Sequence, residues 1–467
     1  MIPYLPRQIA TKGIYLYLGA LAAVTIFFFR HAMNILYIAM GIMWVVGFFL
    51  LTSYCSKKWQ AIPRKALLRN LFLTALGLRV AWVIFSYFFY IIKTGMPFEF
   101  DAADSVGYWE DGAWLATEKW SVTNDYLFGN YKDLSDSGYL LYLIFLYKII
   151  GPNIFITRIL KAIISAVTVL LIYNVSKRNI GEEPGRLAGI MACFMPNLIF
   201  YCGLHLKETE MIFLMMAFLE RADYLIRTKH YNVFTIAIPV LLALSLFTFR
   251  TVIGAAAVFS LVTALIFTNT SVIGRGKRIM LITWGVLAAT LLVGGTITNE
   301  SEILWEQRDT NQANKRAQQT AGGNHWAKYA TGTVMAPMMF VLPFPTMVDV
   351  DEQYTQQMLS GGNFVRNFLG AFVLIAVFSV IFITKNWRNL SLLGSFVAAY
   401  LGIVSTSGFA NSERFLLPGL PILLIIAAYG MSLLNAKNYR FVKIWYWIVP
   451  IMSFAWAFFK LGSRGLF

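Results

Sequence analysis

The dominant feature of the sequence is a series of apolar segments, each long enough to cross a lipid bilayer. A crossing helix needs about 20 mainly apolar residues. Such segments are expected at 14–29, 33–53, 70–92, 154–176, 186–205, 209–226, 232–249, 251–269, 279–297, 366–384, 390–408, 414–434 and 442–462. Since backbone polar groups find no water inside a bilayer, these segments are expected to be helical. The predicted fold is an all-α polytopic membrane protein with about 13 transmembrane helices.

Composition excludes the other broad classes of protein. Only 13% of the 467 residues are charged, about half the fraction that is usual in a soluble domain. An aromatic fraction of 16% argues against a disordered chain as well. The three cysteines, Cys55, Cys193 and Cys202, lie in or beside apolar segments. Their odd number makes a disulfide framework or a zinc cluster unexpected.

The distribution of charge predicts how the chain is oriented. If the N-terminus is cytoplasmic, the cytoplasmic segments hold 21 Lys and Arg residues against four acids. This is the bias that the positive-inside rule describes. The net charge of +16 is therefore explained by topology and does not indicate nucleic-acid binding. We expect a multi-pass protein of the plasma (inner) membrane, with its long loops on the outer or periplasmic face.

The long outer loops divide the chain. Four parts are expected: an N-terminal hairpin with a basic loop (1–65), a transmembrane core that includes an acidic outer loop at 93–153 (66–297), an outer polar and proline-containing region (298–365), and C-terminal helices (366–467). Residues 139–150 are apolar but too short to cross, which predicts a helix lying on the outer membrane face. Residues 334–348 are short and interrupted by proline, so a re-entrant or interfacial segment is expected there.

The acidic outer loop contains the first candidate catalytic residues. Asp101 and Asp104 follow a predicted span by about ten residues, so both are expected near the membrane surface. Tyr108 comes one helical turn after Asp104, which places the two on one helix face. A carboxylate beside aromatic rings suits a general base acting on a sugar hydroxyl. Most other acids of this loop are expected to be solvated.

Further ionisable residues are expected at the outer ends of the spans. Lys207 and Glu208 lie at an outer turn, where they are either functional or simply solvated. Three arginines at outer helix ends either anchor the helices among headgroups or clamp a phosphate through the planar guanidinium: Arg158, Arg250 and Arg414. Glu413 is expected to bind substrate or to pair with its neighbour. Arg79, inside a span, must find an acid or backbone carbonyls.

Several of these residues occur in a familiar order. Arg79 precedes Asp104-Ser-Val-Gly-Tyr108, then Arg186-Leu-Ala-Gly, Pro196-Asn-Leu-Ile and Glu208 follow, and later Arg250, Pro343-Phe-Pro345 and Glu413-Arg-Phe-Leu-Leu-Pro418. This order resembles the GT-C superfamily of membrane glycosyltransferases, in particular bacterial, polyprenyl-phosphate-sugar-dependent members similar to protein mannosyltransferases and aminoarabinose transferases. The likeness covers roughly residues 66–435.

The resemblance implies a reaction and a set of roles. Such enzymes move a sugar from a polyprenyl-phosphate or polyprenyl-diphosphate carrier to an envelope glycan, lipid or protein acceptor, here on the outer or periplasmic face of the membrane. Asp104 matches the general base, Asp101 is its rival, and Glu208 matches a second acid. The candidate substrate-binding residues are Tyr108, Arg158, Lys207, Arg250, Glu413 and Arg414. No cofactor is certain. Because Ser105 replaces the acid that usually follows the first Asp, a divalent metal at Asp101 and Asp104 stays open.

Two other functions compete with glycosyl transfer. An O-antigen-type polysaccharide polymerase would tolerate loss of Asp104 but fail on loss of Arg250 or Arg414. A lipid-linked glycan flippase or transporter would be expected to show internal repeats and charged helices at mid-membrane. The sequence has no convincing repeat, and Arg79 is its one clearly intramembrane charge.

Overall fold

The computed structural model describes residues 4–129, 134–228, 232–267, 283–285, 344–350, 353–383, 386–406, 413–462 and 466. These residues are mainly helical, and a single isolated bridge between Ala32 and Val348 is their one β contact. Among them, eight helices are long and apolar enough to cross a membrane, or nine if one bent pair is counted. The prediction of an all-α multi-pass membrane protein is confirmed, whereas the number thirteen stays a prediction.

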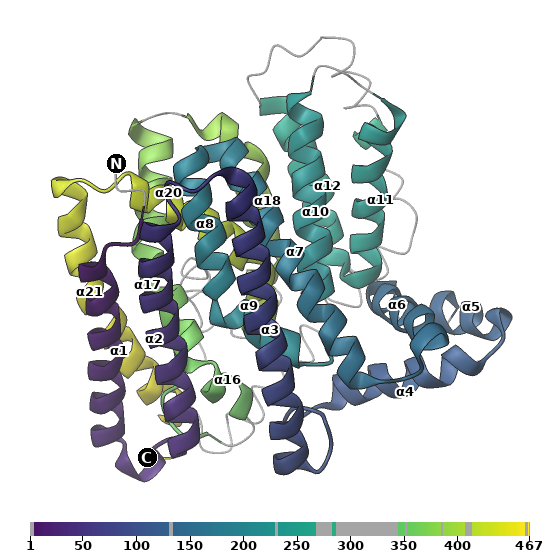
Figure 1. Ribbon diagram of the computed structural model, residues 1–467, viewed down its shortest axis with the longest axis horizontal. Helices are drawn as coiled ribbons and strands as arrows, with labels where there is room; N and C mark the ends of the chain where they lie inside the picture. Colours follow the sequence, from purple (N-terminus) through teal and green to yellow (C-terminus); the bar gives the residue numbers. More distant parts are fainter. Residues whose placement is uncertain are drawn as a thin grey trace.

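Helices from the first half of the chain lie in one bundle with helices from the second half (Figure 1). The long helices of the first half are α1 (Arg7–Phe27), α2 (Ile35–Lys58), α3 (Arg64–Thr94) and α7 (Ile154–Ile180), and a bent span follows in α8 (Glu182–Phe194) and α9 (Pro196–Phe200). The bent pair turns by 50° between Phe194 and Pro196. Proline has no N–H to continue the helix, so the predicted span at 186–205 is broken.

The remaining helices complete the bundle. They are α10 (Glu208–Arg227), α11 (Val233–Phe249), α12 (Thr251–Phe267), α16 (Tyr354–Met358), α17 (Ser360–Phe378), α18 (Ser391–Thr406), α19 (Glu413–Leu416), α20 (Leu420–Ser432) and α21 (Ala436–Gly462). The predicted span at 279–297, except for 283–285, and the polar stretch 298–335 lie outside the described residues. Of the segment predicted to be re-entrant, residues 344–348 are extended and buried against the loop after α1.

Three helices project sideways from one end of the bundle (Figure 1). They are α4 (Ala103–Thr117), α5 (Trp120–Phe128) and α6 (Leu134–Ile150). The predicted helix at 139–150 forms the second part of α6, and its buried side chains Tyr139 and Leu143 pack against the bundle. The position of this helix on a membrane surface stays a prediction.

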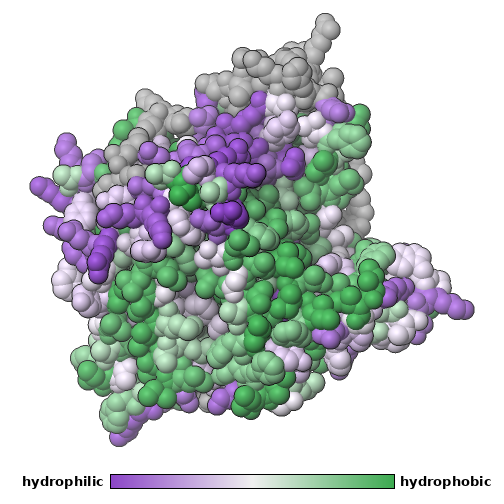
Figure 2. Space-filling view, in the orientation of Figure 1, coloured by the Kyte–Doolittle hydropathy of each residue, from purple (hydrophilic) through white to green (hydrophobic). Residues whose placement is uncertain are grey.

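At the opposite end of the bundle, arginines bind polar groups of neighbouring helices and loops. Arg186 donates to the carbonyl oxygens of Trp59 and Ile62 in the loop between α2 and α3, and Arg227 bonds Asn179 at the end of α7. Figure 2 shows hydrophilic residues gathered at the upper end of the molecule, with a broad apolar belt below them. Hydropathy does not report which side of a membrane this end faces, so the predicted sidedness stays a prediction.

Arg79 is fully buried and joins three helices. Its guanidinium donates to Ser165 on α7 at 2.7 Å and to the carbonyls of Ala192 and Cys193 on α8 at 3.2 Å each. These two carbonyls lie just before the break at Pro196, where the helical hydrogen bonds that would satisfy them end. The expectation that Arg79 finds backbone carbonyls is confirmed, and its role is structural.

Replacing Arg79 with methionine is expected to destabilise the bundle. Arg79→Met leaves the carbonyls of Ala192 and Cys193 buried without their donor, and each such group costs about 1–3 kcal/mol. We expect a lower thermal midpoint in lipid nanodiscs. Arg69→Met, which removes an exposed cation from the same helix, is the control. Equal midpoints for the two variants would contradict the structural role.

Candidate functional site

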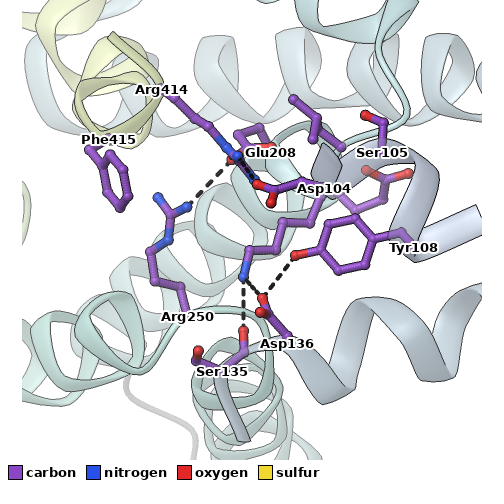
Figure 3. Close-up of polar contacts among 12 residues, drawn as sticks. Asp104, Ser105, Tyr108, Ser135, Asp136, Glu208, Arg250, Arg414 and Phe415 are labelled. Atoms are coloured by element: carbon purple, nitrogen blue, oxygen red, sulfur yellow. Dashed lines mark hydrogen bonds and ion pairs between the residues drawn. The ribbon is translucent and has the colours of Figure 1, made fainter. Parts of the chain in front are cut away.

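Four predicted site residues come together at the end of the bundle that carries α4 (Figure 3). Asp104 is in the first turn of α4, Glu208 begins α10, Arg250 follows the end of α11, and Arg414 is on α19. Negative charge at a helix N-terminus is favourable because the helix dipole is positive there. This helps to place both carboxylates where they lie. We call these four residues the acid–arginine cluster.

Arg414 links the two carboxylates of the acid–arginine cluster. Its Nη1 donates to Asp104 Oδ2 and its Nε to Glu208 Oε1. The Nη2 of Arg250 lies 3.4 Å from the same Glu208 oxygen. The guanidinium of Arg250 also stacks on the Phe415 ring, 4.6 Å from its centroid. Glu208 therefore holds two arginines, and Asp104 contacts one of them.

Exposure is graded across the acid–arginine cluster. The Glu208 side chain is 0% exposed, that of Arg414 is 23% exposed, and that of Asp104 is 58% exposed. A buried charge is tolerated only when it is paired, which the two arginines achieve for Glu208. Asp104 is the carboxylate of the cluster that a solute in water can reach.

A second polar set adjoins the cluster. Lys207 donates to the Asp136 carboxylate and, at 3.0 Å, to the carbonyl of Ser135, while the Tyr108 hydroxyl donates to Asp136 at 2.9 Å. Burial lowers the pKa of Lys207, and the carboxylate of Asp136 opposes this shift. Burial, then the Asp136 charge, raises the pKa of Tyr108, so the phenol stays a neutral donor.

Asp136 is a residue that the sequence analysis missed. It is one acid among several in the loop 93–153, and no spacing distinguishes it from its neighbours. Its partners Lys207 and Tyr108 were predicted for other reasons. The packing of α6 beside α4 brings Tyr108 to Asp136 (Figure 3). Lys207 reaches Asp136 from the residue before α10.

Two candidate substrate-binding residues lie away from the cluster. Arg158 is buried in α7, with Nη2 at 3.9 Å from Glu99 Oε2. Glu413 is buried and accepts hydrogen bonds from Asn197 and, at 3.1 Å, from Asn363. Although Glu413 and Arg414 are adjacent in sequence, they bind different partners, so the alternative of a local ion pair between them is wrong.

The acidic loop is not uniformly solvated. Glu110 is exposed as expected, but Glu99 is buried and accepts a hydrogen bond from Ser105, the residue that follows Asp104. The expectation of solvation is therefore wrong for Glu99. Its buried partner Arg158 compensates the charge, and the contact with Ser105 holds the start of α4.

Asp101 precedes α4 as an exposed residue with a φ of 55°, in the left-handed region. Asp and Asn tolerate this conformation better than most side chains. In the part of the chain that the structure describes, no three His, Cys, Asp or Glu residues gather as a metal site would need. The possible metal at Asp101 and Asp104 gains no support from this geometry.

Comparison with known proteins assigns no family. No family model matches the chain, and no curated protein matches it. One similar solved structure is the oligosaccharyltransferase of Archaeoglobus fulgidus, in a complex with Zn and sulfate. It shares 12% identity at a TM-score of 0.45, over 85% of this chain and 53% of that one. The chain thus spans about half the length of the solved chain that it matches.

The chemistry of the site follows from its exposed and buried parts. An exposed carboxylate can accept a proton from a hydroxyl, and paired guanidinium groups can bind a phosphate in bidentate fashion. In this cluster Asp104 is the exposed carboxylate, and Arg414 and Arg250 are the guanidinium groups.

Proposed function

We propose that this protein is a membrane glycosyltransferase that moves a sugar from a polyprenyl-(di)phosphate carrier to a hydroxyl acceptor of the cell envelope. One observation carries the proposal. An exposed carboxylate, Asp104, lies directly beside a partly buried guanidinium, Arg414, at the end of a bundle of membrane-crossing helices. Such a pair places a proton acceptor and a phosphate binder side by side, where a lipid carrier can present its headgroup.

The residues divide the work as follows. Asp104 removes the proton of the acceptor hydroxyl, and Arg414 and Arg250 hold the carrier phosphate. The phosphate is already a good leaving group, so orientation and electrostatic stabilisation supply most of the acceleration. Glu208, buried between the two arginines, keeps both guanidinium groups in place. We therefore assign Glu208 to positioning the arginines. The exposed Asp104, and not Glu208, accepts the proton.

Residues outside the cluster support it. Lys207 and Tyr108 fix Asp136 and with it the start of α6. Arg158 acts through Glu99 and Ser105 on the start of α4, and Glu413 anchors the start of α19. We assign Arg158 and Glu413 to positioning, although the sequence suggested substrate contact for both.

The test is a transfer assay. Purified protein in lipid is incubated with radiolabelled polyprenyl-phosphate and polyprenyl-diphosphate sugars together with cell-envelope lipids and glycans. We expect wild-type protein to consume a donor and label an acceptor. Chain extension that survives loss of Asp104 would instead support a polymerase. Carrier movement across the bilayer without any bond change would support a transporter.

Loss of Arg414 is expected to weaken donor binding. Hydrogen bonds to charged groups contribute about 1.5–3 kcal/mol, so Arg414→Ala should raise the apparent donor dissociation constant about 10-fold to 100-fold. Arg30→Ala removes an exposed arginine from the loop after α1 and is the matched control. Unchanged donor affinity in Arg414→Ala would count against phosphate clamping.

A further inference from the structure

The acid–arginine cluster is balanced in charge without any ligand. Two carboxylates, Asp104 and Glu208, face two guanidinium groups, Arg250 and Arg414. The neighbouring Lys207 and Asp136 form a second balanced pair. An anionic ligand that simply joined this arrangement would leave an uncompensated charge in a partly buried place, which is costly. A carboxylate must therefore give way when an anion binds.

The two carboxylates differ in how easily they can leave. Glu208 is 0% exposed and contacts two arginines, so separating it from them would leave a buried, unpaired charge. Asp104 is 58% exposed and contacts Arg414 alone among the arginines of the cluster. Exposed ion pairs contribute little free energy, because water solvates the separated groups well. Asp104 is the replaceable partner of Arg414.

The start of α4 stabilises the Asp104 carboxylate after it separates from Arg414. Asp104 is in the first turn of α4, where unpaired N–H groups and the helix dipole favour negative charge. Arg414, in contrast, stays in place because Glu208 holds its Nε and because Tyr400 donates at 2.6 Å to the carbonyl of the next residue, Phe415. The movement therefore falls on the carboxylate and not on the arginine.

We propose that Arg414 exchanges Asp104 for the phosphate of the donor, so that donor binding frees Asp104 before the acceptor arrives. This inference rests on the proposed function and deepens it. In the donor-free protein Arg414 holds Oδ2 of Asp104, so the exchange makes this oxygen available to the acceptor hydroxyl as well. Binding is therefore ordered, with the donor first and the acceptor second.

Every bond, proton and electron pair is accounted for in the proposed transfer. The acceptor oxygen forms its bond to the sugar C1 as its proton passes to Asp104. The bond between C1 and the phosphate oxygen breaks, and the phosphate keeps the electron pair while it is held by Arg414. Release of the carrier phosphate and loss of the proton to water return Asp104 to Arg414.

Because one phosphate replaces one carboxylate, the exchange predicts which donor charge the site prefers. A phosphodiester carries a single negative charge and replaces one carboxylate without changing the charge around Glu208, Arg250 and Arg414. A diphosphate brings an additional charge that the balanced cluster does not compensate. The structure thus favours a sugar linked through a single phosphate over one linked through a diphosphate.

The experiment measures binding and needs no turnover. Wild-type protein in nanodiscs of zwitterionic lipid is titrated with a short-chain dialkyl phosphate, a monoanionic phosphodiester, and with the neutral trialkyl phosphate. Because Asp104→Asn removes the competitor for Arg414, we expect it to bind the dialkyl phosphate about twofold to fivefold more tightly. Affinity for the trialkyl phosphate should not change. Unchanged or weaker dialkyl phosphate binding by Asp104→Asn would overturn the exchange.

Two further variants make the test specific. Glu110→Gln, at an exposed acid of the same helix, should leave dialkyl phosphate binding unchanged. In Arg414→Ala, the additional change Asp104→Asn should no longer tighten binding, because the two residues act on each other. A gain that persists without Arg414 would show that Asp104 repels the anion from a distance and would refute the exchange. Tighter binding of a dialkyl diphosphate to wild type would refute the preference for a single phosphate.

Failure of this inference can be told from failure of the proposed function. If the exchange is seen with the dialkyl phosphate but no sugar is transferred from any donor, the glycosyltransferase proposal is wrong and the exchange stands. If sugar is transferred but Asp104→Asn does not tighten binding, the enzyme stands and the exchange is wrong.

Discussion

Asp104→Asn is expected to abolish sugar transfer while the protein stays folded and inserted. The amide cannot accept the proton of the acceptor hydroxyl, and loss of a general base lowers rates about 10²-fold to 10⁴-fold. Because Asp104 is 58% exposed, its replacement should not disturb the packing of α4. The measurement is the rate of label transfer from donor to acceptor, with thermal unfolding recorded on the same samples.

The controls for this variant come from the same segment. Glu110→Gln neutralises an exposed acid of α4 and should leave transfer near the wild-type rate. Asp101→Asn tests the rival base, which is exposed and precedes the helix. Normal transfer by Asp104→Asn with loss in Asp101→Asn would move the catalytic role to Asp101. Normal transfer by both would favour a polymerase that depends on Arg250 and Arg414.

Glu208→Ala is expected to cost both stability and donor binding. Removing one partner of a buried ion pair typically destabilises a protein by about 3–5 kcal/mol, and Glu208 compensates two arginines at once. Arg250 loses its carboxylate partner within the cluster, and Arg414 loses the contact that orients its Nε. Thermal unfolding in nanodiscs and titration with dialkyl phosphate measure the two effects separately.

A comparison with Glu110→Ala isolates the effect of burial at Glu208. The two variants remove the same side-chain type, one from an interior position and one from an exposed helix face. Only Glu208→Ala should lower the thermal midpoint and weaken anion binding. If Glu208→Ala unfolds no earlier than Glu110→Ala, the pairing with the two arginines does not stabilise the fold. Unimpaired anion binding would mean that Glu208 does not position them.

The broad architecture was readable from the sequence because the bilayer imposes simple rules. Segments of about 20 apolar residues must be helices there, and the structure has helices at the predicted spans that it describes. The partners of Arg79 followed from the same physics, since a buried guanidinium needs acceptors. The break at Pro196 was not predicted, because hydropathy alone does not report whether a span is continuous.

The residues of the site were predicted from local signals, but their partners were not. Asp104 and Arg414 were each selected by position near a helix end, and their contact joins residues 310 positions apart. A pattern within one segment cannot predict a contact between residues that lie so far apart in the sequence. Asp136 and the buried Glu99 escaped notice for the same reason, since each owes its role to a helix that packs against it from elsewhere in the chain.

The sequence by itself determined the helical membrane fold, the concentration of cations at one end of the helices and the residue types available for chemistry. These properties depend on composition and period within single segments. The tertiary structure decided that Glu413 is turned inward while Arg414 reaches Glu208 and Asp104. It also decided which carboxylate is buried and which is exposed. The reason is that burial and pairing depend on the packing of α4, α10, α11 and α19 together, which no one of these segments specifies.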